Sequence, residues 1–232
     1  MTIPTRPRAW AAALVVAAVA AGCAGPAPTS SPVPVVTPAP LVALAPGTYD
    51  SSTFRPQTTV TLPAGWAIVG DDGTYFGLQP VSSDALGIHL FRSPRAASQD
   101  LQCPETGEPN VGTSAADLVG WIRARPGLTA GDATSVTLGG FAGLQVDAAI
   151  KTGWTASCPF ANGTPTVPLF VGATDGTFRW VMAGSERLRL VVLDVPGKGT
   201  IVVDIDAFDG TLMDGFLPLA APIVESIRFG LP

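Results

Sequence analysis

The sequence has 232 residues, of which 13 are basic and 18 acidic, and its formal net charge at pH 7 is −5. Charged residues make up only 13% of the chain and apolar residues 47%. An acidic chain whose only lysines are Lys151 and Lys198 has no basic surface for a phosphate backbone or for anionic lipid headgroups. We therefore expect no nucleic-acid partner and no membrane contact through a polybasic patch.

The N-terminus has the pattern of a targeting segment. Arg6 and Arg8 precede an apolar run over residues 10–21. The run has about a dozen residues, whereas a helix that spans a bilayer needs about 20. Residues 1–22 are therefore predicted to be a signal peptide and not a transmembrane helix.

This signal peptide is followed by a cysteine. Residues 20–23, Ala-Ala-Gly-Cys, resemble the lipobox of bacterial lipoproteins, in which the cysteine becomes the lipidated first residue of the mature protein. Ala20 stands where this motif usually has leucine, and a plain secretory cleavage after residues 18–20 is the alternative. The resemblance implies acyl chains, such as palmitate, on Cys23. These would anchor the protein in the cell envelope, on the outer face of the cytoplasmic membrane.

Residues 23–46 are predicted to carry the lipid and to form an extended stalk. Residues 24–46 contain seven prolines among alanine, valine, serine and threonine, a composition that favours polyproline-like structure and cannot form a packed core. Residues 47–232 are numerous enough for one domain with its own core. We expect them to form a single globular domain.

Cys103 and Cys158 remain once Cys23 is assigned to the lipid. Two cysteines in an oxidising compartment are typical of a disulfide, and each of these precedes a proline, which favours an extended or turn segment. Their bridge would close a loop of roughly 56 residues and contribute about 4 kcal/mol in the chain-entropy model. Two free thiols or two metal ligands are the alternatives, although no further cysteine or clustered histidine completes a metal site.

Most of the domain has the composition of short strands separated by turns. Short apolar or β-branched segments separated by turn signals predict strands over residues 58–62, 66–69, 75–78, 88–91, 135–138, 177–182, 187–195 and 200–208. A strand over residues 141–150 is predicted from the alternation of Leu144, Val146, Ala148 and Ile150 with polar or small neighbours. The segments 93–112 and 157–168, which contain the two cysteines, are predicted to be loops.

Two segments carry helical signals. A helix with a cap at residues 113–114 has its apolar residues on one face and is expected to stop at Pro126. Residues 212–227 are expected to be helical on either side of Pro218 and Pro222. The well-formed part is predicted to begin at Pro222 or a little earlier, because proline is accepted in the first turn of a helix.

Four segments carry a resemblance to a known family. They are Leu-Pro-Ala-Gly-Trp at 62–66, Arg-Pro-Gly-Leu at 125–128, Gly-Gly-Phe-Ala-Gly-Leu-Gln-Val-Asp at 139–147 and Ile-Val-Glu-Ser-Ile-Arg-Phe at 223–229. In this order they resemble the Mog1/PsbP-like domains of bacterial surface lipoproteins, over about residues 47–229. The resemblance implies an α+β fold, mainly an antiparallel sheet with a central and a C-terminal helix packed on it. It also implies a binding, accessory or unassigned role and names no ligand.

The sequence offers little for catalysis. His89 is the only histidine, and strand alternation places it on the face opposite Ile88 and Leu90, so we expect it to be exposed or at a sheet edge. As a general base it would need a nucleophile and an orienting acid, and neither is evident nearby in the sequence. The segment 196–200 lacks the glycine spacing of a phosphate loop and is predicted to be a turn. We therefore expect no catalytic residue and no cofactor.

Two features are weak candidates for binding. Asp204 and Asp206 project from one face of a strand and Asp209 lies at its end, so three carboxylates could approach one cation. A solvated strand face followed by a turn and helix cap explains the same residues. Among the tryptophans, Trp154 is expected to be exposed and is a candidate ligand contact, whereas the others in the domain, Trp66, Trp121 and Trp180, are expected to pack in the core.

These observations favour a membrane-anchored, non-enzymatic binding or accessory module of the cell envelope, whose partner is an envelope protein or a small ligand. The first alternative is a carboxylate-dependent hydrolase of the envelope. It requires a pocket in which two of five aspartates converge, namely Asp147, Asp175, Asp194, Asp204 and Asp206. The second alternative is a purely structural envelope component.

Overall fold

The computed structural model describes residues 41–230. The predicted signal peptide, the lipidation site Cys23 and the stalk up to residue 40 lie outside these residues. Within the described part of the chain, no helix has both the length and the apolar character that crossing a membrane requires.

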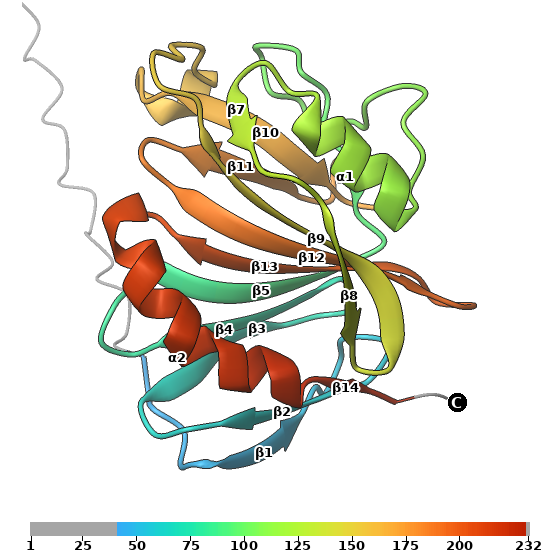
Figure 1. Ribbon diagram of the computed structural model, residues 1–232, viewed down its shortest axis with the longest axis vertical. Helices are drawn as coiled ribbons and strands as arrows, with labels where there is room; N and C mark the ends of the chain where they lie inside the picture. The colour runs from blue at the N-terminus through green and yellow to red at the C-terminus, as the bar shows by residue number, and fades with distance from the viewer. Residues whose placement is uncertain (1–40, 231–232) are drawn as a thin grey trace, which may run out of the picture. The chain divides into compact units, whose positions relative to one another are not determined.

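An antiparallel sheet of eight strands forms the centre of the domain (Figure 1). Its strands, in spatial order, are β3 (Trp66–Asp71), β4 (Tyr75–Pro80), β5 (Leu86–Arg92), β13 (Gly199–Ala207), β12 (Arg187–Val195), β9 (Phe141–Ile150) and β7 (Leu128–Ala130), and β8 (Thr134–Leu138) also pairs with β9. The bounds predicted for β9 and β12 are confirmed to the residue.

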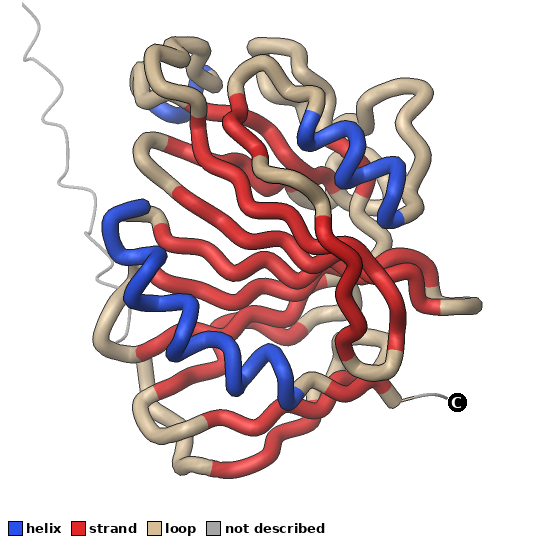
Figure 2. Tube along the Cα trace, in the orientation of Figure 1, coloured by secondary structure: helices blue, strands red, loops and turns tan. Residues whose placement is uncertain are grey.

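Two small antiparallel sheets flank the central one (Figure 2). One contains β1 (Gly47–Asp50), β2 (Thr58–Leu62) and β14 (Arg228–Phe229). The other contains β6 (Arg95–Ala96), β10 (Thr166–Val171) and β11 (Arg179–Ala183). With the helices α1 (Ala115–Arg123) and α2 (Met213–Ser226) they give an α+β architecture, which confirms the fold class expected from the sequence.

Both faces of the central sheet are covered, each with its own hydrophobic core. The core beneath α2 contains Val191 and Leu193 of β12, and the core beneath α1 and β10 contains their neighbours Leu190 and Val192. Residues 190–193 of β12, Leu-Val-Val-Leu, form a continuous apolar run because both faces are covered there. Side chains in this central stretch are buried on either face, whereas Arg187 and Arg189 at the start of the strand are partly exposed.

Helix α1 begins as its sequence predicts. Ser114 is the N-cap, and its side chain and that of Asp117 bind each other's backbone N–H groups in a capping box. Leu118 and Ile122, four residues apart, are fully buried against the sheet. The capping residue and the apolar face together account for where this helix starts and how it packs.

Helix α2 is longer than its prolines suggest. It runs from Met213 to Ser226 through both Pro218 and Pro222, so the prediction that its well-formed part begins near Pro222 is wrong. The two prolines are exposed, whereas Phe216, Ala220 and Ile223 are buried on the opposite side. Burial of this apolar face outweighs the two hydrogen bonds that the prolines remove.

The two predicted loops contain strands that the sequence did not reveal. The segment 157–168 includes the start of β10, which is buried along its length, and the segment 93–112 includes β6. Pro168 breaks the strand pattern of β10 in the sequence. In the structure the register between β10 and β11 shifts between Pro168 and Phe170, and this irregularity accommodates the proline.

The disulfide between Cys103 and Cys158 is confirmed, with its two Cα atoms 5.6 Å apart. It connects the loop that follows β6 to the 3-10 helix η1 (Pro159–Ala161) before β10. Free thiols and metal ligation are therefore excluded for these two cysteines. The pair fixes one end of the layer that covers the α1 side of the sheet.

Candidate functional site

Three polar side chains form a row across adjacent strands of the central sheet. Tyr75 of β4 places its hydroxyl oxygen 2.7 Å from Nδ1 of His89 on β5. His89 Nε2 in turn lies 3.2 Å from Oδ1 of Asp206 on β13, but the two groups are not aligned as a hydrogen bond. We call Tyr75, His89 and Asp206 the polar row.

The polar row corrects the expectation for His89. Strand β5 lies between β4 and β13, and the His89 side chain is only 11% exposed, so the histidine is neither on the surface nor at a sheet edge. Alternation placed it on the correct face, opposite Ile88 and Leu90. That face is covered by the small sheet of β6, β10 and β11, most of which was not predicted.

Glycines make room for the polar row. A Cβ atom on Gly70 or Gly77 would overlap the Tyr75 side chain, and a Cβ atom on Gly87 would overlap His89 Nε2. Gly70 pairs with Gly77, and Gly77 pairs with His89 in the strand registers. The rings of Tyr75 and His89 therefore occupy the space that side chains at these three glycine positions would fill.

Trp180 of β11 packs against His89 of the polar row. Its indole ring lies 4.7 Å from the His89 ring, and its Nε1 donates a 2.7 Å hydrogen bond to Oδ2 of Asp204. Asp204 is fully buried, and it is the strand partner of His89. Oδ1 of Asp204 and Oδ1 of Asp206 accept no hydrogen bond from the described residues.

Glu186 adds a third buried acid. It lies in the turn between β11 and β12, is 4% exposed, and accepts a 2.8 Å hydrogen bond from the backbone N–H of Ala183. Burial, with the charge of Asp206, raises the pKa of Glu186 to about 8. Burial also raises the pKa of Asp204 well above its ordinary value, and Asp206 and Glu186 add to the effect. At neutral pH, Glu186 is therefore mostly protonated, and burial favours the protonated form of Asp204.

The phenol of Tyr75 stays protonated for the same reasons. Burial and the neighbouring carboxyl groups of Asp206, Asp204 and Asp72 raise its pKa above the ordinary value of 10.0. The neutral phenol shares a hydrogen bond with Nδ1 of His89, in which either atom can be the donor. Tyr75 is therefore a neutral partner of His89 in the polar row.

An open pocket of about 390 Å³ adjoins this cluster. Its aromatic lining consists of Tyr75, Phe91, Phe178 and Trp180, and its other lining residues are Asp72, Thr74, Thr177 and Arg179. We call it the aromatic pocket. The rings contact one another, with centroids 5.6 Å apart for Tyr75 and Phe91 and for Phe91 and Phe178, and 4.9 Å apart for Phe91 and Trp180.

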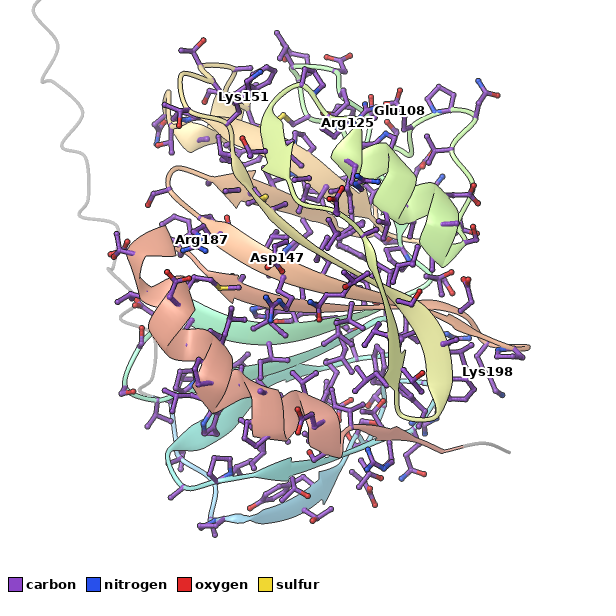
Figure 3. All side chains as sticks on the ribbon, viewed as in Figure 1. Glu108, Arg125, Asp147, Lys151, Arg187 and Lys198 are labelled. Carbon is purple, nitrogen blue, oxygen red and sulfur yellow. A yellow bond between two sulfur atoms is a disulfide. The ribbon has the colours of Figure 1, made fainter. Side chains whose placement is uncertain are left out.

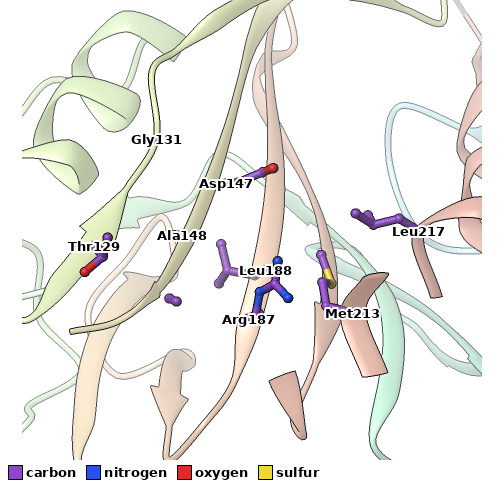
Figure 4. A pocket seen from close by; sticks show the side chains of 9 residues that line it. Thr129, Gly131, Asp147, Ala148, Arg187, Leu188, Met213 and Leu217 are labelled. Carbon is purple, nitrogen blue, oxygen red and sulfur yellow. The ribbon is translucent and has the colours of Figure 1, made fainter. Parts of the chain in front are cut away.

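A second pocket, of about 210 Å³, lies on the α2 side of the sheet (Figure 4). Arg187 and Asp147 lie on neighbouring strands (Figure 3) and line the pocket beside Met213 and Leu217 (Figure 4). These charges are already neutralised within the chain. Arg187 forms an ion pair with Asp214 at 3.0 Å, and Asp147 receives two hydrogen bonds from Arg189. This pocket is therefore the weaker candidate.

The aspartates named from the sequence are only partly brought together. Asp204 and Asp206 meet, but both are buried, so the explanation of a solvated strand face is wrong. Asp209 lies elsewhere and binds the backbone N–H and hydroxyl of Thr211 at the N-cap of the 3-10 helix η2 (Gly210–Leu212). Among residues 41–230, no group of three histidine, cysteine or acidic side chains is arranged to hold a metal ion.

The other three aspartates of the hydrolase hypothesis do not converge with this pair. Asp147 binds Arg189, Asp175 binds Arg95, and Asp194 accepts a hydrogen bond from the first backbone N–H of α1. Each has a structural partner in its own part of the domain. The pair that does meet, Asp204 and Asp206, is closed off from water by the sheet layer above it.

Trp154 is half-buried and does not line the aromatic pocket. Its indole N–H donates a 2.9 Å hydrogen bond to the backbone oxygen of Thr166 near the disulfide. Trp66 and Trp121 are buried, as predicted. Trp180, in contrast, was assigned to the core and is instead a half-buried wall of the aromatic pocket. Tyr75 and Glu186 were not singled out from the sequence at all.

With the geometry in place, the chain was compared with known proteins. No family model matches the sequence. No curated protein sequence matches it either.

Solved structures do match the fold. One is the solution structure of cyanobacterial PsbP (CyanoP) from Synechocystis sp. PCC 6803. Its TM-score is 0.39 and its identity 10%, and the match covers 80% of this chain and 94% of that one. Another is a 1.50 Å crystal structure from Bacteroides thetaiotaomicron, with a TM-score of 0.36 and 8% identity. That match covers 75% of this chain and 45% of the Bacteroides chain. At these values neither neighbour indicates what the present chain binds.

Proposed function

We propose that this protein is an extracytoplasmic, lipid-anchored binding module that holds a small ligand in the aromatic pocket. The observation that carries the proposal is the pocket itself: four aromatic side chains line an open depression and are supported from behind by the polar row. Sites with aromatic walls and few polar groups are typical of small-molecule binding. Tyr75 and Trp180 belong both to the pocket and to the buried network, so the walls are held in one geometry.

The protonation of the cluster supports binding over catalysis. A nucleophile or general base needs a proton acceptor that reaches the substrate. Here the phenol of Tyr75 is neutral, Glu186 holds its proton, burial favours the protonated form of Asp204, and the buried carboxyl groups do not line the pocket. These features fit a rigid support for the pocket wall.

The proposed location rests on the sequence and on the disulfide. A lipobox-like segment ending at Cys23 follows the predicted signal peptide, and a disulfide is typical of an oxidising compartment outside the cytoplasm. The test is intact-mass spectrometry of the protein extracted from native membranes. We expect a chain that begins at Cys23 and carries acyl groups, and a Cys23→Ser variant that leaves the membrane fraction. An unlipidated chain with another N-terminus would overturn the anchor.

The binding role has its own test. A small-molecule library is screened for thermal stabilisation of the wild-type protein and of two variants, Phe178→Leu in the aromatic pocket and Leu219→Ala on the exposed surface of α2. We expect compounds that stabilise the wild type and Leu219→Ala but not Phe178→Leu. Stabilisation that is equal in all three proteins would place binding outside the pocket.

A carboxylate-dependent hydrolase is the second candidate, because Asp206 lies beside His89 and two strand positions from Asp204. For hydrolysis, the buried carboxyl groups would have to become accessible to substrate. Turnover of envelope glycans or esters by the wild type that is lost in Asp206→Asn would establish it. We expect no such turnover.

A further inference from the structure

Aromatic rings form much of the wall of the aromatic pocket, and the lining residues offer few free side-chain donors. Each hydroxyl and indole N–H group of the lining residues already forms a hydrogen bond within the protein. The Tyr75 hydroxyl binds His89, and Trp180 Nε1 binds Asp204. The hydroxyls of Thr74 and Thr177 bind the Asp72 carboxylate and the backbone oxygen of Thr174. A ligand that needs many hydrogen bonds, such as a sugar, would find few partners there.

The charge at the edge of the pocket is negative. Partial burial works to raise the pKa of Asp72, but hydrogen bonds from the backbone and hydroxyl of Thr74 and from the backbone of Tyr75 outweigh it, and the net pKa lies below 3.8. Asp72 is therefore ionised at neutral pH. Asp71 lies next to it and is held ionised by hydrogen bonds from residues 52–54.

The arginine among the lining residues does not offset this charge. Side chains alternate along β11, so Arg179 projects away from the face that carries Trp180. Its guanidinium donates to the backbone oxygen of Cys103 at 3.0 Å, lies 3.7 Å from Glu105, and stacks on Phe160 with 4.3 Å to the ring centroid. The charged group is thus bound at the disulfide loop.

We propose that the aromatic pocket binds an organic cation of the alkylammonium class. This inference rests on the proposed binding function and names its ligand. Cations are attracted to the faces of aromatic rings, and quaternary ammonium groups are recognised by clusters of such rings because they need no hydrogen-bond partner. The rings of Tyr75, Phe178 and Trp180 line the pocket, Asp72 adds the complementary charge, and about 390 Å³ accommodates a trimethylammonium group.

The deciding experiment compares two probes of nearly the same shape. Choline carries a trimethylammonium group, and 3,3-dimethylbutan-1-ol is its neutral isostere. Binding to the protein extracted from native membranes in detergent is measured by calorimetry and by tryptophan fluorescence, with ionic strength held constant by sodium chloride. We expect choline to bind at least about 10-fold more tightly than the neutral alcohol, the size of a good cation–π contribution.

Variants locate the binding. Phe178→Leu keeps an apolar side chain but removes a ring, and we expect it to weaken choline about 3- to 10-fold. Asp72→Asn removes the charge but keeps a side-chain oxygen that can accept the hydrogen bonds from Thr74. We expect it to weaken choline binding about 2- to 5-fold. Asp132→Asn removes a charge from an exposed residue that is paired with Arg123, outside the pocket, and we expect no change. Circular dichroism spectra confirm that each variant is folded.

The outcomes separate this inference from the proposed function. If the neutral alcohol binds as tightly as choline, or if a methyl glycoside binds and choline does not, the cation inference is wrong and the pocket remains a binding site. If choline binds equally to wild type, Phe178→Leu and Asp72→Asn, it binds elsewhere and the inference is also wrong. If no library compound or probe distinguishes wild type from Phe178→Leu, the proposed function fails as well.

Discussion

At the residue scale, Trp180 connects the aromatic pocket to the buried acids. Its indole N–H is the hydrogen-bond donor that the structure provides for the Asp204 side chain. Trp180→Phe keeps the ring and removes this donor, which leaves a fully buried carboxyl oxygen without a partner. We expect the free energy of unfolding to fall by about 1–3 kcal/mol, as measured by urea denaturation.

The control for this prediction is a double-mutant cycle with Asp204→Leu, which removes the acceptor and keeps a side chain of similar size. If the Trp180 N–H acts through Asp204, the two substitutions together should cost less than the sum of their separate effects. Additive losses would mean that Trp180 contributes to stability only by packing.

Glu186 makes stability depend on pH. Its pKa is about 8 in the folded protein and near 4.5 when the chain is unfolded, so between these values the folded state binds more protons. Stability is therefore fully present below about pH 4.5 and is lost as pH rises towards 8. Asp204 acts in the same direction. We expect the free energy of unfolding to fall by the order of a few kcal/mol between pH 5 and pH 9.

Denaturation of wild type and Glu186→Gln at pH 5, 7 and 9 tests this dependence. Glutamine has no proton to lose, and its oxygen can still accept the hydrogen bond from Ala183. The variant should therefore match the wild type at pH 5 and exceed it at pH 9. Parallel pH curves for the two proteins would show that Glu186 does not titrate as the structure indicates.

Sequence reasoning at this scale succeeded for side-chain direction and failed for burial. Alternation correctly placed Asp204 and Asp206 on one strand face and His89 on the face opposite Ile88. Alternation could not show that another layer covers this face, because β10 was not predicted and Trp180 was assigned to the core. Whether a polar strand residue is solvated depends on such distant segments, and this explains why the cluster was not foreseen.

At the scale of secondary structure, α2 is a helix that tolerates two prolines. Pro222 is exposed and leaves the backbone oxygen of Pro218 without the usual N–H partner. We expect Pro222→Ala to restore this bond and raise the free energy of unfolding by about 1–3 kcal/mol.

Pro63, in the turn after β2, serves as the matched control for this substitution. Proline in a turn stabilises mainly by restricting the unfolded chain, so Pro63→Ala should lower the stability by about 0.4–1 kcal/mol. Opposite signs for the two alanine substitutions support the explanation. A loss of stability in both would show that the helix has adapted to its proline at position 222.

Local signals determined the elements that they described well. The capping residues of α1, the apolar alternation of β9 and the β-branched run of β12 predicted these elements because pattern and turn residues agree there. They disagreed at Pro168 in β10 and at Pro218 and Pro222 in α2. In those segments tertiary burial overrides the local preference, and a single sequence gives no measure of that burial.

At the scale of the whole molecule, the disulfide holds the layer that forms one wall of the pocket. It spans 55 positions in sequence, and the backbone oxygen of Cys103 accepts a hydrogen bond from Arg179 on β11. Replacing both cysteines by serine should lower the free energy of unfolding by up to about 4 kcal/mol. Thermal unfolding of the double variant, compared with the wild type with and without reductant, measures the effect.

Reductant serves as the internal control for the disulfide. It should lower the melting temperature of the wild type to near that of the double variant and leave the double variant unchanged. If the wild type is insensitive to complete reduction, which mass spectrometry verifies, the bridge does not stabilise the domain. The α+β architecture and this bridge were both predictable from the sequence. The location of the pocket was not, because its walls come from β4, β5 and β11.

The bare backbone beneath the polar row has a consequence for tracing the ancestry of this chain. Gly70, Gly77 and Gly87 lie on three neighbouring strands, and the rings of Tyr75 and His89 occupy the space above them. These positions are coupled, because alanine at 77 or 87 requires the ring above it to move or to be replaced. Paired substitution of a glycine and its ring would therefore mark the lineages in which this site was abandoned, even where overall sequence similarity has faded.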